Sequence, residues 1–278
     1  MDSPGKVCIP IPDVDFRPEF AQNRSPLQTT ICIHLEGRGV IMRIFVISVL
    51  LLSGWHATAA DIDWQVTRSW TPALEKKFSE FVNILGTSGC RTLTECLTSS
   101  ASNPFYAART PKRRYPADCA DFPFSLRMYF AWMEELPFDY VSRAVPANSR
   151  NETKGDLRYT KFGNKPGAWR TIQAGGTYDF FAELSALRGA VSTATYRMHY
   201  DYISDFYPPA ISPAQIQPGT VVYDPSGHAA IVYAVQKDGR IRLMDAHPDN
   251  SVTRITYDQK FSRSRPRMGR GLRIGGRN

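Results

Sequence analysis

The sequence predicts an α+β domain in which helices come first and an antiparallel sheet follows. The first part of the domain has apolar residues at helical spacing, whereas the last part has short alternating runs separated by turn residues. Segregation of helices and strands along a chain is typical of the α+β class, in which helices pack on an antiparallel sheet. The sequence shows no internal repeat and no glycine-rich phosphate-binding loop.

Three segments have the apolar spacing of helices. The first covers residues 71–85, the second runs from about 120 to 135 and ends before Pro137, and the third covers 178–188. Residues 87–114, between the first two, are expected to be rich in loops. The short strands are expected at residues 220–223, 229–235, 241–245 and 252–257, with turns at 224–227 and 237–239.

An insertion at about residues 145–215 separates the second helix from the sheet. Its first part, residues 145–169, is polar and lacks a sustained apolar period. Long loops in compact domains are commonly lids or binding loops, so we expect this part to border a cleft, with Arg158, Tyr159 or Trp169 near the substrate path. The alternative is a surface insertion without a role.

Residues 42–60 have the pattern of a secretory signal peptide. A short basic start at Arg43 precedes the apolar run 44–55, which is too short to span a bilayer, and Ala57 to Ala60 offers a small-residue cleavage site. A signal normally begins a protein, so residues 1–41 are expected to be a non-native extension. The exported chain, residues 61–278, then forms one domain in the periplasm or outside the cell. The alternative is that the apolar run anchors the chain in a membrane.

Export to an oxidising compartment affects the interpretation of the cysteines. Cys8 and Cys32 precede the cleavage site, which leaves three cysteines in the exported chain. Cys90 and Cys96 are candidates for a disulfide, although a spacing of six residues on one helix would hold the two sulfurs apart. If they pair, Cys119 is the odd thiol.

Cys119 has the setting of a nucleophile, because it lies at the start of the second predicted helix. The positive end of the helix dipole favours a thiolate there. The neighbours Asp118 and Asp121 suit capping positions in the first turn. The alternative is that Cys119 is a small buried apolar residue.

Two histidines and one carboxylate near the end of the chain complete a candidate catalytic set. His228 begins a predicted strand and shares a face with Ala230 and Val232, which leaves room for a helix N-terminus to approach. Asp245 ends the next strand of the hairpin and suits the role of orienting the imidazole, with His247 as the other candidate. The same residue types bind zinc elsewhere, but no closely spaced Cys or His pair supports a metal, and no cofactor is expected.

The formal charge of +8 comes from residues 61–278, because acidic and basic residues cancel in the first sixty. The excess is concentrated at residues 112–114 and in the basic tail, residues 258–278. An exported basic protein suits an anionic envelope polymer and not nucleic acid. The alternative is that these positions are ordinary solvated faces.

Several of these elements resemble those of the NlpC-type cell-wall peptidases and the related CHAP amidases, which have a papain-like fold. Asp118-Cys119-Ala-Asp-Phe is similar to their Asp-Cys-Ser-Gly-Phe element, and Pro104-Phe-Tyr106 resembles the Pro-Tyr element that precedes it. Pro218-Gly219-Thr-Val-Val-Tyr and Gly227-His228-Ala-Ala-Ile-Val are similar to the elements around the family's histidine. Asp245 follows His228 in the sequence at about the spacing that separates the orienting acid from the histidine in the CHAP amidases. This sequence departs from the pattern where Ala120-Asp121 replaces Ser-Gly.

The resemblance implies a monomeric, exported cysteine peptidase or amidase, a thiol hydrolase that cleaves peptide amides of peptidoglycan. It implies Cys119 as nucleophile, His228 as base and Asp245 or His247 as orienter, with Tyr106 and Asp118 near the oxyanion and substrate. The run Cys119-Ala-Asp-Phe also resembles transglutaminase-like cysteine proteases, which implies acyl transfer as an alternative. A third possibility is an envelope-binding protein that keeps the fold without the chemistry.

Overall fold

The computed structural model describes residues 6–10, 30–34, 63–148, 155–210, 212, 214–224, 227–257 and 271–275. The chain forms two compact units, Met1–Trp55 and His56–Asn278. In the first unit, β1 (Lys6–Pro10) pairs antiparallel with β2 (Thr30–His34), a pairing that the sequence pattern did not predict. The predicted signal peptide lies outside the described residues. Within the described part of the chain, no helix has both the length and the apolar character needed to cross a membrane.

The second unit is a mixed α+β structure with small antiparallel sheets, as the sequence predicts. Its main sheet has six antiparallel strands in the order β11-β10-β9-β8-β12-β7. These strands are β7 (Phe206–Tyr207), β8 (Val221–Asp224), β9 (His228–Val235), β10 (Ile241–Ala246), β11 (Val252–Thr256) and β12 (Gly271–Gly275).

The helices agree with the predicted segments, with small shifts at their ends. The three long ones are α1 (Pro72–Thr87), α3 (Phe122–Met133) and α4 (Phe180–Ala190). The two short ones are α2 (Leu93–Thr98), which lies in the segment expected to be loop, and α5 (Thr193–Tyr196). Thr71 shows why α1 begins where it does, because its side chain accepts a hydrogen bond from the backbone N–H of Leu74.

The expectation of a polar loop over residues 145–169 is only partly correct. The two ends of this segment belong to strands that pair as a long antiparallel hairpin, β4 (Phe138–Pro146) and β5 (Asn164–Ile172). A single turn of 3₁₀-helix, η1 (Leu157–Tyr159), lies between them. A second small pair joins β3 (Asp63–Trp64) to β6 (Tyr178–Asp179). The strands were missed because β5 is half-buried along most of its length, so it lacks the alternation that marks a strand.

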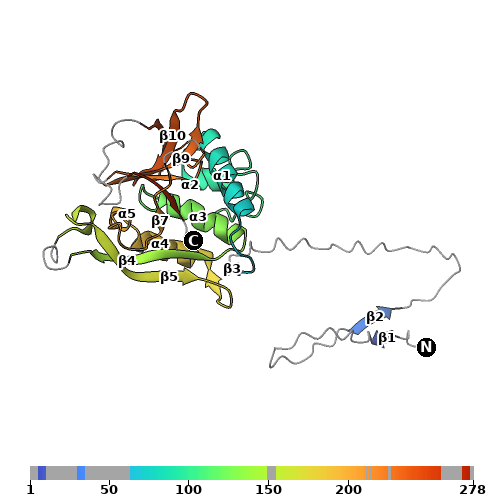
Figure 1. The fold of residues 1–278 in the computed structure, drawn as a ribbon. Coiled ribbons are helices and arrows are strands. Elements are labelled where there is room, and N and C mark those ends of the chain that lie inside the picture. Colours follow the sequence, from blue (N-terminus) through green and yellow to red (C-terminus); the bar gives the residue numbers. More distant parts are fainter. Residues whose placement is uncertain are drawn as a thin grey trace, which may run out of the picture. The chain divides into compact units, whose positions relative to one another are not determined.

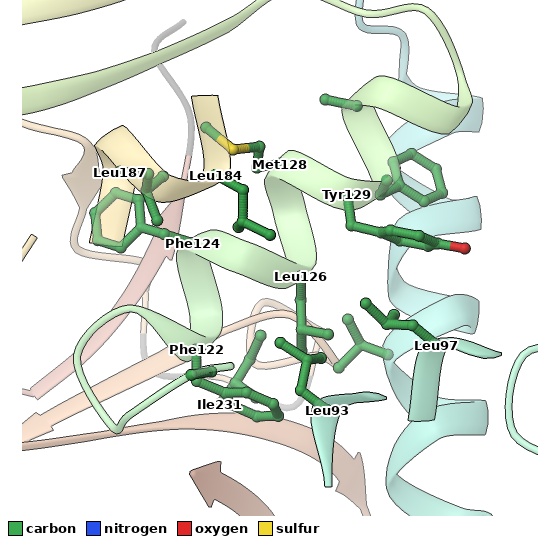
Figure 2. Close-up of a cluster of buried hydrophobic side chains, with 14 of the residues drawn as sticks. Leu93, Leu97, Phe122, Phe124, Leu126, Met128, Tyr129, Leu184, Leu187 and Ile231 are labelled. Atoms are coloured by element: carbon green, nitrogen blue, oxygen red, sulfur yellow. The ribbon is translucent and has the colours of Figure 1, made fainter. Parts of the chain in front are cut away.

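Helix α3 lies at the centre of the second unit, between the main sheet and the layer formed by α4 and the β4–β5 hairpin (Figure 1). All its residues except Arg127 are buried. Its side chains meet α2 at Leu93 and Leu97, α4 at Leu184 and Leu187, and β9 at Ile231 (Figure 2). A helix enclosed on several sides by apolar contacts has few ways to shift, so its N-terminus occupies a well-determined place.

The face of β9 that packs toward the helices is the opposite of the predicted one. Ala229, Ile231 and Tyr233 belong to the apolar cluster that contains α1 and α3. Ala230 and Val232 belong instead to a separate cluster with Val222 and Leu243. The helices therefore pack on the Ala229 face and not on the Ala230 face, although His228 at the head of the strand does lie near Cys119 at the start of α3.

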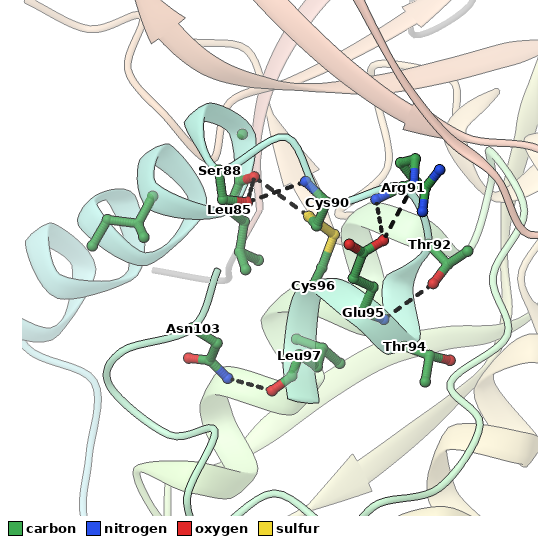
Figure 3. The surroundings of a disulfide bond; sticks show 12 residues. Leu85, Ser88, Cys90, Arg91, Thr92, Thr94, Glu95, Cys96, Leu97 and Asn103 are labelled. Carbon is green, nitrogen blue, oxygen red and sulfur yellow. Dashed lines mark hydrogen bonds and ion pairs between the residues drawn. A yellow bond between two sulfur atoms is a disulfide. The ribbon is translucent and has the colours of Figure 1, made fainter. Parts of the chain in front are cut away.

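Cys90 and Cys96 form a disulfide, with their α-carbons 5.1 Å apart (Figure 3). The bond closes because Cys90 precedes α2 and Cys96 lies within it, so the two residues are not six apart on one helix. Arg254 of β11 holds the same region, because its guanidinium donates to the carbonyl oxygens of Leu85, Gly86 and Cys90 at 2.6–3.0 Å. The disulfide and the arginine together connect the end of α1 to the outer strand of the sheet.

Removing the disulfide should destabilise the second unit moderately. For a closed loop of this length, the loss of chain entropy in the unfolded state gives about 2 kcal/mol. A chain with both Cys90→Ser and Cys96→Ser should therefore unfold at lower denaturant concentration, with its free energy of unfolding reduced by about that amount. A reducing agent should lower the stability of the native chain and leave that of the double variant unchanged. Equal stability of the two oxidised proteins would contradict the expectation.

Candidate active site

Cys119 lies in a tight turn immediately before α3, where two carboxylates fix the backbone. Asp118 Oδ1 accepts hydrogen bonds from the N–H groups of Ala120 and Asp121, at 2.9 and 3.3 Å. Asp121 Oδ1 accepts from the N–H of Asp118 at 2.9 Å, and the N–H of Phe122 donates to the Asp118 carbonyl at 3.0 Å. Cys119 is a free, half-buried thiol held at the helix start by this set of bonds.

Residues distant in the sequence also contact this turn and hold it in place. The hydroxyl of Tyr196, a fully buried residue of α5, donates to the Ala120 carbonyl oxygen at 2.5 Å. Arg188 of α4 lies 3.4 Å from the buried carboxylate of Asp121. Burial, followed by repulsion from Asp118, raises the pKa of Asp121 to about 7.

His228 joins Cys119 to a buried carboxylate. It is the first residue of β9, and its ring lies near enough to Cys119 for that side chain to affect the pKa of His228. On the other side, its Nε2 lies 2.6 Å from Asp245 Oδ2. The hydrogen bond to Asp245 and then the nearby Cys119 side chain raise the pKa of His228 to about 9, although burial opposes the shift. The imidazole is therefore positively charged at neutral pH.

Asp245 lies in β10 and is almost completely buried. Its Oδ1 accepts a hydrogen bond from the Thr253 hydroxyl at 2.5 Å, because Thr253 lies directly opposite in β11. Burial raises the pKa of Asp245, but the hydrogen bonds from His228 and Thr253 lower it by more, so the net shift is downward. The carboxylate is thus charged, with both oxygens in hydrogen bonds.

The His247 ring stacks on that of His228, with the centres of the two rings 6.4 Å apart. Its Nε2 lies 2.9 Å from Thr253 Oγ1 and 3.7 Å from Asp245 Oδ2. Of the two predicted orienting residues, Asp245 is the one with a short polar contact to the imidazole, at 2.6 Å. His247 contacts Thr253 and Asp245 and is more exposed than either His228 or Asp245.

Tyr106 does not lie where the sequence predicts. It is 2% exposed, and its hydroxyl donates to Glu134 Oε1 at 2.6 Å. Its ring packs against Phe81 and Phe130 in the interior. Tyr106 is therefore a core residue with a satisfied hydroxyl, and the expectation that it contributes to substrate or oxyanion binding is wrong.

Of the three residues expected to border the cleft, only Tyr159 lies near the histidine turn. A Cβ built on Gly227, the residue before His228, would lie 3.7 Å from the Tyr159 hydroxyl and 3.8 Å from Thr193 Oγ1. Gly227 has φ +100°, which favours glycine. Arg158 pairs with Asp156, and Trp169 lines a surface groove with Tyr200 and Tyr202.

Sequence reasoning missed Thr253 and Tyr196, which hold the carboxylate and the nucleophile turn. Thr253 carries a usable signal, because a strand opposite Asp245 is predictable once the last hairpin is assigned. Tyr196 carries no such signal in the sequence, because Ala120, whose carbonyl oxygen it contacts, lies 76 positions away. Among the described residues, no group of three or more His, Cys, Asp or Glu side chains is arranged to hold a metal ion.

Comparison with known proteins gives no relative: no family model, no curated protein and no solved structure matches this chain. The chemical interpretation therefore depends on the geometry. The Cys119 thiol lies near an imidazole that is hydrogen-bonded to a buried carboxylate. Groups arranged in this way can supply a thiolate to a substrate carbonyl and a proton to its leaving group.

The buried carboxyl of Asp121 should make stability depend on pH. Because its pKa is raised to about 7 in the folded chain, the folded state binds a proton between pH 4 and 7 that the unfolded state has lost. The free energy of unfolding should therefore fall as pH rises through this window, by about 1.4 kcal/mol for each pKa unit. Asp121→Asn should remove this slope in urea unfolding, whereas Asp238→Asn at an exposed turn should retain it. If the free energy of unfolding changed with pH in the same way in wild type and Asp121→Asn, the pH dependence could not be assigned to Asp121.

Proposed function

We propose that this chain is a papain-like cysteine hydrolase that cleaves peptide amide bonds. The observation that carries the proposal is the row of Cys119, His228 and Asp245, in which His228 is hydrogen-bonded to Asp245 and lies near the Cys119 thiol. The three residues come from a helix start and two neighbouring strands, which is the arrangement that a nucleophile, a general base and an orienting acid require. Thr253 completes the row by fixing the second oxygen of Asp245.

In the proposed reaction, the Cys119 thiolate attacks the carbonyl carbon of the amide and forms a tetrahedral intermediate. The His228 imidazolium gives its proton to the leaving amine, which departs and leaves a thioester on Cys119. Neutral His228 then takes a proton from water as the water attacks the thioester. Release of the carboxylic acid regenerates the thiolate and the imidazolium.

Asp245 supports this cycle in two ways. It holds His228 through one ring nitrogen, so that the other is directed at the thiol, and it stabilises the positive charge of the imidazolium. The N–H of Ala120 is held by Asp118, so it is not an oxyanion donor. We propose the N–H of Cys119 itself for that role, as its place at the start of α3 suits a developing negative charge.

The proposed substrate is the peptide part of peptidoglycan. The support is the predicted export of a basic chain and its sequence resemblance to cell-wall hydrolases, while the envelope polymer would be engaged by the basic tail. Acyl transfer to an amine is the alternative on the same residues, supported by the run Cys119-Ala-Asp-Phe. It differs in its products, because transfer incorporates an amine and creates no new carboxyl group.

Replacement of the nucleophile should abolish turnover without unfolding the chain. Cys119→Ala should release no new amino groups from purified peptidoglycan, while its thermal unfolding stays close to that of the wild type. His228→Ala should be equally inactive, but it should unfold at a lower temperature because the buried Asp245 loses a donor. His199→Ala is the matched control, since His199 stacks on Tyr200 and contacts Asp201 away from this row. Wild-type turnover in Cys119→Ala would end the proposal. Turnover lost equally in His199→Ala would show a loss of folding instead.

The alkaline limit of activity should follow the pKa of His228. Because this pKa is raised to about 9, chiefly by Asp245, kcat/KM should fall only as pH rises above about 9, where the imidazolium loses its proton. Asp245→Asn keeps the shape and removes the charge, so the alkaline limb should move to lower pH and kcat should drop. Thr253→Val removes one donor from Asp245 but keeps its charge, so the alkaline limb should stay near its wild-type pH. An unchanged limb in Asp245→Asn would rule out its role as the orienting residue.

A further inference from the structure

A surface groove of about 830 Å³ lies on the insertion at about residues 145–215. All its lining residues fall within residues 166–208, from the first half of β5 to the residue after β7, and none of them belongs to the proposed active site. Ligand clefts in proteins commonly have volumes of about 300–1,000 Å³, so this groove is large enough for a small organic ligand or a short segment of a polymer.

Exposed aromatic side chains gather in this groove. Seven large apolar or aromatic side chains are exposed among the described residues, and four of the seven line the groove. These four are Tyr200, Tyr202, Ile203 and Tyr207, with exposed fractions of 62, 39, 76 and 38%. Single exposed apolar side chains are common on protein surfaces, whereas a group of them in a concave site is typical of a binding surface.

Trp169 and Pro166 of β5 give the groove a wall that is held from the interior. The Trp169 ring is half-buried and packs against the apolar cluster that includes Val141 of β4 and Ala194 of α5. This wall is therefore fixed by the β4–β5 hairpin and by α5, and a ligand would not have to order it. A site that is ordered before the ligand arrives loses less conformational entropy on binding.

The polar groups of the groove can both donate and accept hydrogen bonds. Its three tyrosine hydroxyls can do either, and the largely exposed carboxylate of Asp201 can accept. A saccharide suits this combination, because the edges of its rings carry hydroxyls that donate and accept, while its C–H faces pack on aromatic rings. Proline-rich segments also bind aromatic grooves, but proline has no N–H, so such a segment would offer Asp201 few donors.

We propose that this groove binds a neutral oligosaccharide whose ring substituents are equatorial. Rings of this kind present C–H groups on both faces, which would pack against Trp169 and the tyrosine rings, and hydroxyls at their edges, which would donate to Asp201. Aromatic packing and hydrogen bonds of uncharged hydroxyls provide the recognition. The proposal therefore depends neither on the net charge around the groove nor on the proposed hydrolase.

The β-1,4-linked tetramer of N-acetylglucosamine tests the proposal on the full chain by isothermal titration calorimetry, with decaproline as the comparison ligand. The tetrasaccharide should bind with a dissociation constant of about 1 mM or less, and decaproline at least about ten-fold more weakly. Tyr202→Ala should weaken the tetrasaccharide at least about ten-fold, whereas Tyr202→Phe keeps the ring and should lose less. Asp201→Ala should also weaken it, because the sugar hydroxyls lose an acceptor.

Two control variants should bind the tetrasaccharide like the wild type. Phe105→Ala removes an exposed aromatic ring that lies outside the groove, and Cys119→Ala removes only the proposed nucleophile. Four results would overturn the proposal. They are no binding of the tetrasaccharide to the full chain, binding of decaproline with equal or higher affinity, wild-type affinity in a folded Tyr202→Ala, and an equal loss of affinity in Phe105→Ala, which would place the binding elsewhere.

Discussion

The hydrogen bond between His228 and Asp245 is the interaction on which the candidate site depends. A carboxylate as deeply buried as Asp245 is costly unless each oxygen has a donor, and His228 and Thr253 provide these donors. The bond therefore has a structural and a chemical consequence. It stabilises a charge inside the protein, and it keeps a positive imidazolium beside the Cys119 thiol.

Contacts elsewhere in the fold hold the strand next to Asp245 and the turn that carries Cys119 in fixed positions. Strand β11 carries Thr253, and the neighbouring Arg254 ties that strand to the carbonyl oxygens at the end of α1 and to the disulfide loop. Helix α3 is enclosed by apolar contacts, and Tyr196 and Asp118 fix the turn from which Cys119 projects. The thiol thus lies at the start of an enclosed helix and the imidazole at the head of a strand of the main sheet, which is the kind of fixed placement that the proposed reaction requires.

The sequence was sufficient to predict the three long helices, the strands β8 to β11 and the proximity of His228 to Asp245. Period-two alternation and the turn at residues 237–239 place His228 and Asp245 on adjacent strands, and the helix start singles out Cys119. The β4–β5 hairpin was missed, because its half-buried second strand has no regular apolar alternation. Tyr106 was misplaced because its partner Glu134 is 28 positions away, and nothing local distinguishes a buried tyrosine from one in a cleft. The face of β9 was reversed since parity alone does not say which side of a sheet the helices cover.

The measurement that tests the account most directly is the protonation of His228, followed by imidazole ¹⁵N NMR and assigned with His228→Gln. If the thiol, imidazole and carboxylate act as one charged unit, the His228 ring stays doubly protonated through neutral pH and loses a proton only near pH 9. The midpoint should then move to lower pH in Asp245→Asn and, by a smaller amount, in Cys119→Ala. A midpoint at the ordinary histidine value of 6.5 in the native chain would contradict the account, because the imidazole would then not be coupled to either partner.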